Sequence, residues 1–204
     1  MNDIENGLKE VAEIRSMMER SSKFLSLSGL SGVSAGIVAL AGWAWALSYL
    51  DSRFGPGTEG VVNHRDILSF MLASALVIVA AVGAAMFFSR RLAKRRGLAL
   101  WNATARDTLA ALLIPLGSGG LFSLILMRQE LYGMIPSAML LFYGMALVNA
   151  GKYTVHDLRL LGLCEIVLGL IAGLLPALGL WFWAAGFGLL HVIYGVAMYR
   201  KYEK

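Results

Sequence analysis

The feature that most constrains this chain is a series of six long apolar runs, each bounded by charged or turn-forming residues. A helix needs about 20 mostly apolar residues to cross the hydrocarbon core of a bilayer, which is about 30 Å thick. The chain is 58% hydrophobic and 15% charged, well outside the balance of a soluble domain. The sequence predicts an all-α integral membrane protein, a bundle of six transmembrane helices with spans at about 24–50, 66–89, 107–127, 131–150, 158–177 and 179–199.

The soluble parts of the chain are short. Residues 1–23 carry apolar side chains at helical spacing opposite a charged face, at Ile4, Leu8, Val11, Ile14 and Met18. This pattern predicts a cytoplasmic amphipathic helix that lies on the membrane or against a partner. The segment is too charged for a cleaved secretory signal. The loop 51–65 is too short for an independent domain, and residues 200–204 form a cytoplasmic tail.

The distribution of Lys and Arg predicts the orientation of the bundle. Positively charged flanks are retained on the cytoplasmic side of a membrane. With the N-terminus inside and six spans, fifteen of the eighteen Lys and Arg residues fall on inner flanks, and only Arg53, Arg65 and Arg128 lie outside. An odd number of spans would break this alternation. For a bacterial source, the sequence therefore predicts a multi-pass inner-membrane protein with both termini in the cytoplasm.

The second, fourth and sixth spans end in a similar way. Each has a Gly-x-Ala sequence, beginning at Gly83, Gly144 and Gly195, and a basic flank follows it. This similarity predicts three consecutive helical hairpins inserted in the same direction, as a parallel repeat. The alternative is that apolar helices share Gly and Ala through their composition alone.

Two ionisable residues, Glu165 and His191, lie well inside predicted spans. Ionisation within a bilayer is costly, so such groups are neutral, paired or next to a wet cavity. Both lie on stripes of small residues, which favour close helix packing. At 1.5 Å per residue, Glu165 lies about 9 Å beyond Arg159, and His191 lies about 13 Å before Arg200. We therefore predict that adjacent helices bring the carboxyl and the imidazole into contact.

This polar centre has two interpretations. The pair can hold and pass a proton, bind a cation or report pH, because the charge of each group changes the proton affinity of the other. The pair can also be a structural contact between helices, which contributes about 0.6–2 kcal/mol to stability and fixes the register of the helices. Tyr143, Ser118 and Cys164 are accessory candidates. No metal and no cofactor are expected, because Cys164 and Glu165 point about 100° apart on a helix and no second haem ligand lies at the depth of His191.

An enzyme is the third class considered. Six spans, the run from Gly117 to Gly119 around Ser118, and a histidine in the last span are loosely similar to rhomboid-type intramembrane serine proteases. That similarity would imply hydrolysis through Ser118 and His191. The order departs from the family, since Ser118 lies on the third span instead of the fourth, and no outer loop carries the family's inserted hairpin. The sequence therefore predicts a protein that is not an enzyme.

A basic run follows the second span and comprises Arg90, Arg91, Lys94, Arg95 and Arg96. Cations beside an apolar run contact anionic lipid or a cytoplasmic partner, and nucleic acid is not expected because the cations do not line one soluble face. The preferred function is transport or sensing of a small solute or a proton through the polar centre. The alternative is a non-transporting membrane anchor or regulatory protein that engages a cytoplasmic partner or anionic lipid through its N-terminal helix. The small size of the chain also favours a homo-oligomer or a complex.

Overall fold

The computed structural model describes residues 11, 28–55, 61–97 and 101–204, which form helices and short connections without a β-strand. The α-helices are α2 (Gly29–Phe54), α3 (His64–Arg96), α4 (Ala103–Arg128), α5 (Ile135–Ala150), α6 (His156–Leu174), α7 (Gly179–Trp183) and α8 (His191–Tyr202). A π-helical segment, η3 (Ala184–Leu190), joins α7 to α8, and the 3₁₀ turns η1 (Tyr132–Met134) and η2 (Pro176–Leu178) precede α5 and α7. Apart from Val11, the amphipathic helix predicted for residues 1–23 lies outside the described residues.

Local sequence signals determine several helix ends. At the start of α2, the side chain of Ser28 accepts a hydrogen bond from the backbone amide of Leu30. Asn63 and Asp66 form a capping box at the start of α3, in which each side chain accepts from the backbone amide of the other. α3 ends at Gly97, whose φ of 64° is a left-handed conformation that glycine adopts without steric cost. These signals make α3 longer than the predicted span.

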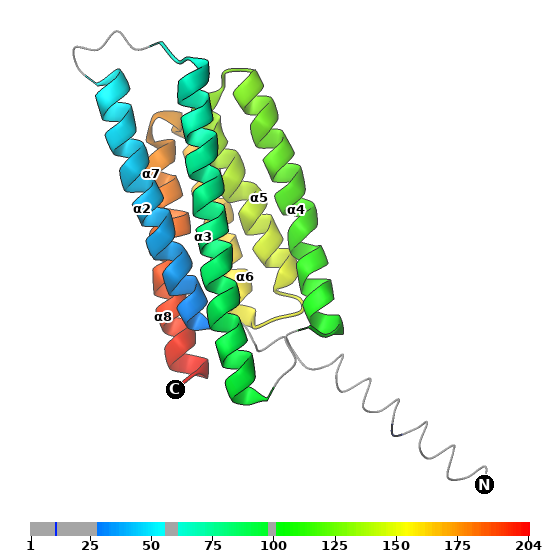
Figure 1. Cartoon of the computed structure of the whole chain (residues 1–204). Coiled ribbons are helices and arrows are strands. Elements are labelled where there is room, and N and C mark those ends of the chain that lie inside the picture. Colours follow the sequence, from blue (N-terminus) through cyan, green and yellow to red (C-terminus); the bar gives the residue numbers. More distant parts are fainter. Residues whose placement is uncertain (1–10, 12–27, 56–60, 98–100) are drawn as a thin grey trace.

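The long helical stretches stand side by side, and successive ones run in opposite directions (Figure 1). α2, α4 and α6 all end at one end of the bundle, here called the outer end. α3, α5 and α8 end at the opposite, inner end, where the C-terminus lies. α2 packs against α3 and α8, while α5 packs against α4 and α6. α3 and α4 therefore flank a centre formed by α2, α5, α6 and the last helix.

In two pairs of helices, glycine residues allow the two backbones to come into contact. A Cβ atom at Gly32 of α2 would lie 3.1 Å from the Cα atom of Gly195 in α8. A Cβ atom at Gly144 of α5 would lie 2.6 Å from the carbonyl oxygen of Gly162 in α6. Because the opposing atoms belong to the backbone, a larger residue would force the helices apart. The predicted packing role of the small-residue stripes is therefore confirmed for these pairs.

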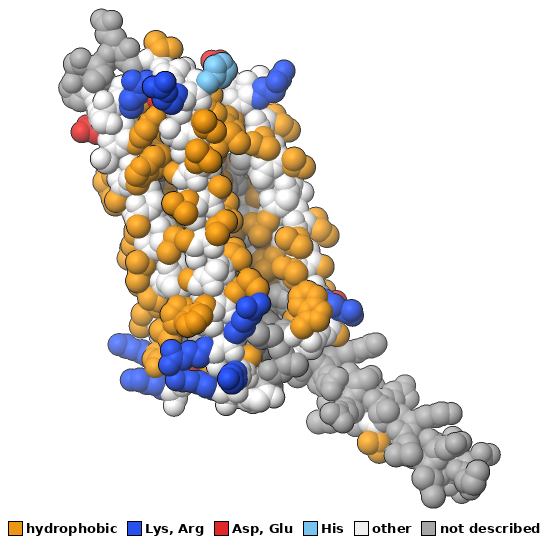
Figure 2. All heavy atoms as spheres, viewed as in Figure 1, with side chains coloured by type: hydrophobic (Ala, Val, Ile, Leu, Met, Phe, Trp, Pro, Cys, Tyr) orange, Lys and Arg blue, Asp and Glu red, His pale blue; other side chains and the backbone are white. Residues whose placement is uncertain are grey.

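Five helical stretches are long and apolar enough to cross a membrane, namely Gly29–Phe54, His64–Arg96, Ala103–Arg128, Tyr132–Ala150 and Pro176–Tyr202. For these five predicted spans, length and apolar character are confirmed. α6, which was predicted as the span 158–177, is not apolar enough to belong to this group. Its 19 residues include the charged side chains of Asp157, Arg159 and Glu165. Figure 2 shows apolar side chains along the length of the bundle, with Lys and Arg gathered towards its two ends.

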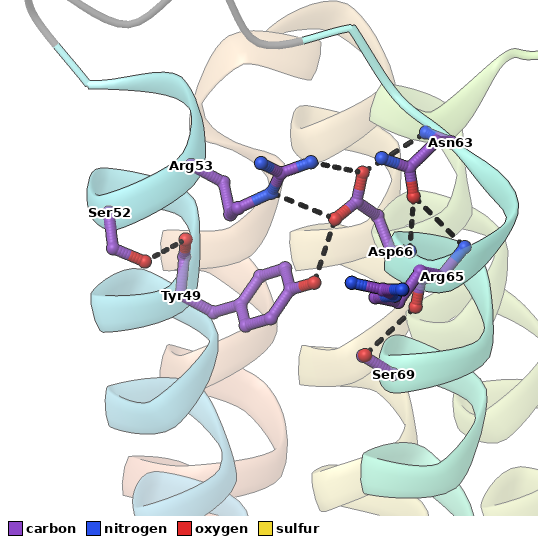
Figure 3. A network of polar contacts seen from close by, with 7 residues as sticks. All are labelled: Tyr49, Ser52, Arg53, Asn63, Arg65, Asp66 and Ser69. Carbon is purple, nitrogen blue, oxygen red and sulfur yellow. Dashed lines mark hydrogen bonds and ion pairs between the residues drawn. The ribbon is translucent and has the colours of Figure 1, made fainter.

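A polar network, here called the outer clamp, joins the end of α2 to the start of α3 (Figure 3). The carboxylate of Asp66 accepts hydrogen bonds from the hydroxyl of Tyr49 at 2.8 Å and from the guanidinium of Arg53 at 3.0 Å. It also accepts from the backbone amide of Asn63 at 3.0 Å. Asp66 is only 2% exposed, so these donors replace water around its charge. Since α3 packs against α2, the clamp fixes the register of the two helices.

The C-terminal residues join several helices at the inner end. The carboxylate of Glu203 accepts hydrogen bonds from the hydroxyl of Ser28, at 3.1 Å, and from the backbone amide of Gly29. An acidic group at this position also complements the positive end of the dipole of α2. The guanidinium of Arg96, at the end of α3, donates to the backbone carbonyl of Tyr202. The ends of α2, α3 and α8 are thereby held together.

Candidate functional site

Glu165 lies in the middle of α6, on the face that packs against α5. The residue has no exposed surface, and Gly162 and Gly169 on the same face are also buried. A Cβ atom at Gly162 would lie 2.8 Å from the amide nitrogen of Val148, so the backbones of α5 and α6 nearly touch beside the carboxyl. The structure therefore places Glu165 inside the bundle.

His191 lies where η3 passes into α8, and both nitrogens of its ring have partners. Nδ1 is 2.9 Å from the carbonyl oxygen of Gly186, and Nε2 is 2.7 Å from the hydroxyl of Tyr143. A carbonyl only accepts hydrogen bonds, so Nδ1 carries a hydrogen, and in a neutral ring Nε2 accepts from the Tyr143 hydroxyl. The π-helical turn between Gly186 and His191 is wider than an α-helical turn, and such turns are frequent at functional sites.

The carboxyl of Glu165 lies directly beside the imidazole of His191. Its Oε1 atom is 3.4 Å from Nδ1, slightly beyond a normal hydrogen bond of about 2.7–3.2 Å. Within the described residues, neither oxygen of the carboxyl has a hydrogen-bond partner. Gly186 makes room for this group, because a Cβ atom there would lie 3.1 Å from Cδ of Glu165. A carboxyl in such a place is stable when it is protonated or when His191 carries a compensating positive charge.

Aromatic side chains cover the outer side of this Glu165–His191 centre. The ring of Phe187 stacks with that of His191 at 6.0 Å between centroids, and it lies 4.8 Å from the ring of Tyr143. Trp183 continues the row, 5.1 Å from Phe187. Trp183, Phe187 and His191 are spaced four residues apart, so they share one face of the last helix. The row therefore separates the polar centre from the outer end of the bundle.

A groove of about 210 Å³ lies between α6 and α8, on the inner side of the centre. Most of its wall is apolar, and Cys164 and Tyr194 are part of it. The hydroxyl of Tyr194 is buried, and no described residue forms a hydrogen bond with it. Asp157 and Lys201 lie at the inner end of the groove, 2.9 Å apart. Hydrogen bonds from Lys201 and then from Tyr202 hold the pKa of the Asp157 carboxyl below its usual value.

The accessory candidates fall in different places. Tyr143 contacts His191 directly. Cys164 is exposed and lines the groove. Ser118 is exposed on α4 and its hydroxyl donates to the carbonyl of Ile114 at 2.9 Å, so the structure does not place it beside His191. In the described part of the chain, no group of three His, Cys, Asp or Glu side chains is arranged to hold a metal ion.

Two structural features were missed by the sequence predictions. The π-helical segment η3, which supplies the carbonyl of Gly186 to His191, leaves no signal in the apolar run 179–199. The outer clamp does have a signal. Asn63 and Asp66 have the spacing of a capping box, and an acidic residue at the start of an apolar helix needs a cationic partner such as Arg53.

Comparisons of the chain with protein-family models, with curated proteins and with solved structures gave no match. The fold and the site therefore define its class on their own. Its described residues form a helical bundle with five helices apolar and long enough to cross a membrane, and at its centre buried Glu165 and His191 lie with the partly buried Tyr143.

Proposed function

We propose that the chain is a multi-pass protein of the cell inner membrane, in which α6 is a sixth span and both termini face the cytoplasm. α6 packs against α5, and its Glu165 is buried, so this charge need not face lipid. Asp157 and Arg159 are close to the inner end, where headgroups and water accept charge. In Figure 1, α2, α4 and α6 all end at the same end of the bundle, which supports a parallel repeat of three hairpins.

The function that the site supports best is transport or sensing of protons by Glu165, His191 and Tyr143. The observation that carries this proposal is the fully buried carboxyl of Glu165, 3.4 Å from Nδ1 of His191. The pair can be a carboxylic acid beside a neutral imidazole, or a carboxylate beside an imidazolium. In the second arrangement Nε2 donates to the Tyr143 oxygen, and the hydrogen of the Tyr143 hydroxyl, which no longer points to Nε2, needs another acceptor. Both arrangements are neutral overall, which avoids the cost of an isolated charge in the membrane.

Proton exchange is proposed to occur with the inner, cytoplasmic side. Asp157 and Tyr194 both line the groove, and Tyr143, which contacts His191, packs against the same cluster of buried residues as Tyr194. These groups form a series from the inner end of the groove to the centre, while aromatic rings cover the outer side. The small apolar groove favours a proton over a larger solute.

Reconstituted protein provides the test of this proposal. Proteoliposomes that contain a trapped pH-sensitive dye are given a potassium diffusion potential, and proton entry is followed by fluorescence. We expect wild-type protein to conduct protons and Glu165→Gln to lose this activity, because glutamine cannot release a proton. Glu130→Gln is the matched control, since Glu130 is exposed in the turn after α4. Equal proton entry in wild type and Glu165→Gln would contradict the proposal.

The same assay separates this proposal from the anchoring or regulatory alternative. That alternative assigns the function to the N-terminal segment, which engages a cytoplasmic partner or anionic lipid. Deletion of residues 2–20 should leave proton entry unchanged if the Glu165–His191 centre acts alone. If the alternative is correct, wild-type protein shows no more proton entry than Glu165→Gln, and the deletion abolishes binding to the cytoplasmic partner or anionic lipid.

A further inference from the structure

α3 has the most exposed apolar surface of the five helices that could cross a membrane. In its most apolar stretch no residue is buried, whereas the corresponding stretches of the other four helices are 17–39% buried. Leu72, Leu76 and Val79 are 62%, 70% and 69% exposed. Since α3 packs mainly against α2, its other faces are available to the surrounding lipid.

A hollow of about 570 Å³ lies along the inner half of α3. Its lining residues are Gly83, Met86, Phe87, Arg90, Arg91 and Lys94. No atom lies within 4 Å of the position that a Cβ atom of Gly83 would take, so the missing side chain contributes to the open space. The lining changes from apolar at Gly83 to cationic at Lys94, over about 16 Å of helix. This is the order in which an acyl chain and a headgroup follow one another in a phospholipid.

The positive charges that line the hollow favour an anionic lipid. Three cations line its inner part, and no acidic side chain of the described residues does so. The last turn of α3 adds further positive charge at Arg95 and Arg96. Guanidinium groups bind phosphate with paired hydrogen bonds, and each cation near an anionic membrane surface contributes a favourable interaction. A headgroup with a second negative charge, on a phosphate or a carboxylate, would therefore bind more strongly.

We propose that this hollow binds one anionic phospholipid. Its phosphate lies among Arg90, Arg91 and Lys94, and one acyl chain lies against Gly83 and Phe87. The site is independent of the Glu165–His191 centre, because it lies on a helix that contributes no group to that centre. It would attach the otherwise weakly packed α3 to the inner leaflet.

The test measures lipid preference with spin-labelled phosphatidylglycerol and phosphatidylcholine. Wild-type protein is reconstituted in phosphatidylcholine vesicles, and the fraction of each labelled lipid that is immobilised by the protein is determined by electron paramagnetic resonance. We expect immobilised phosphatidylglycerol to exceed phosphatidylcholine. The triple variant Arg90→Gln, Arg91→Gln, Lys94→Gln should lower this preference by about tenfold or more, because each cation contributes about 1 kcal/mol. The matched control is Arg106→Gln, Lys152→Gln, Arg200→Gln, which removes the same charge from α4, from the turn after α5 and from α8.

A second variant tests the apolar part of the site. Gly83→Leu fills the open space without a steric clash and should displace the acyl chain, so the preference for phosphatidylglycerol falls although all cations are present. Gly120→Leu on α4 is the control, because nothing lies within 4 Å of its Cβ position either, and it should keep the wild-type preference. Equal effects of the two charge variants would show that only net charge matters and would overturn the site. A wild-type preference in Gly83→Leu would also overturn it.

Discussion

Replacement of Gly186 by alanine tests whether the Glu165 carboxyl lies where the structure places it. The new methyl group would contact Oε2 of Glu165 and would lie 2.5 Å from Cδ2 of Leu140. Glu165 and Leu140 have no exposed surface, so neither side chain can move into open space. An extra methyl group in a well-packed interior costs about 1–3 kcal/mol. We expect Gly186→Ala to lower the free energy of unfolding by this amount.

The assay is reversible unfolding of the purified protein in mixed micelles, with circular dichroism as the readout. Gly120→Ala is the control, because nothing lies within 4 Å of its Cβ position, and it should be more stable than wild type by about 0.4–1 kcal/mol, since alanine restricts the unfolded chain. Gly186→Ala should also reduce proton entry, because it moves the carboxyl away from His191 while keeping every polar group. If Gly186→Ala were as stable as Gly120→Ala, the space beside Gly186 would not be filled by Glu165, and the geometry of the centre would be refuted.

Three further predictions concern other contacts. Tyr143→Phe removes the hydroxyl that contacts His191 and should reduce stability by about 0.6–2 kcal/mol; an unchanged unfolding curve would argue against this hydrogen bond. Asp66→Asn weakens the outer clamp and should cost about 1–3 kcal/mol in the same assay, and no loss would mean that the clamp does not hold α3. The pKa of Asp157 is lowered from 3.8 in the folded protein. Its pair with Lys201 therefore stabilises the fold fully above pH 3.8, and this stabilisation is lost as the pH falls through the lower folded-state pKa. The contribution is below about 1 kcal/mol. Asp157→Asn should remove that part of the acid dependence, and an identical pH profile would contradict it.

The hydrophobic pattern predicts the helices because a long apolar run without turn-forming residues favours one continuous helix. It predicts their ends less well. α3 continues past residue 89 to Arg96, because the basic residues there are compatible with a helix and Gly97 ends it. For α6, a count of charged residues is a poor guide to what the helix exposes to its surroundings. Glu165 lowers the apolar character of this helix, although the side chain is buried against α5 and does not contact the surroundings.

The candidate site could be predicted in part. Glu165 and His191 are the polar residues of two adjacent spans at similar depths, so their proximity follows from helix geometry. The contact of Tyr143 with His191 depends on which face of α5 points towards the last helix, and the apolar sequence of α5 does not reveal this. The position of the Gly186 carbonyl depends on the π-helical turn of η3, which shifts the register of the helix and has no sequence signature.

The most direct measurement of the proton centre is an infrared titration of the purified protein in lipid. A protonated carboxylic acid has a carbonyl band that is separate from the bands of carboxylates and of the peptide backbone. We predict that the wild-type spectrum contains such a band, that it changes with pH, and that Glu165→Gln lacks it while Glu130→Gln retains it. We also predict that His191→Gln shifts its frequency and its titration, because the ring lies 3.4 Å from the carboxyl. A spectrum without a Glu165-dependent band at any pH, or a band that His191→Gln leaves unchanged, would contradict a protonated Glu165 carboxyl whose titration is coupled to His191.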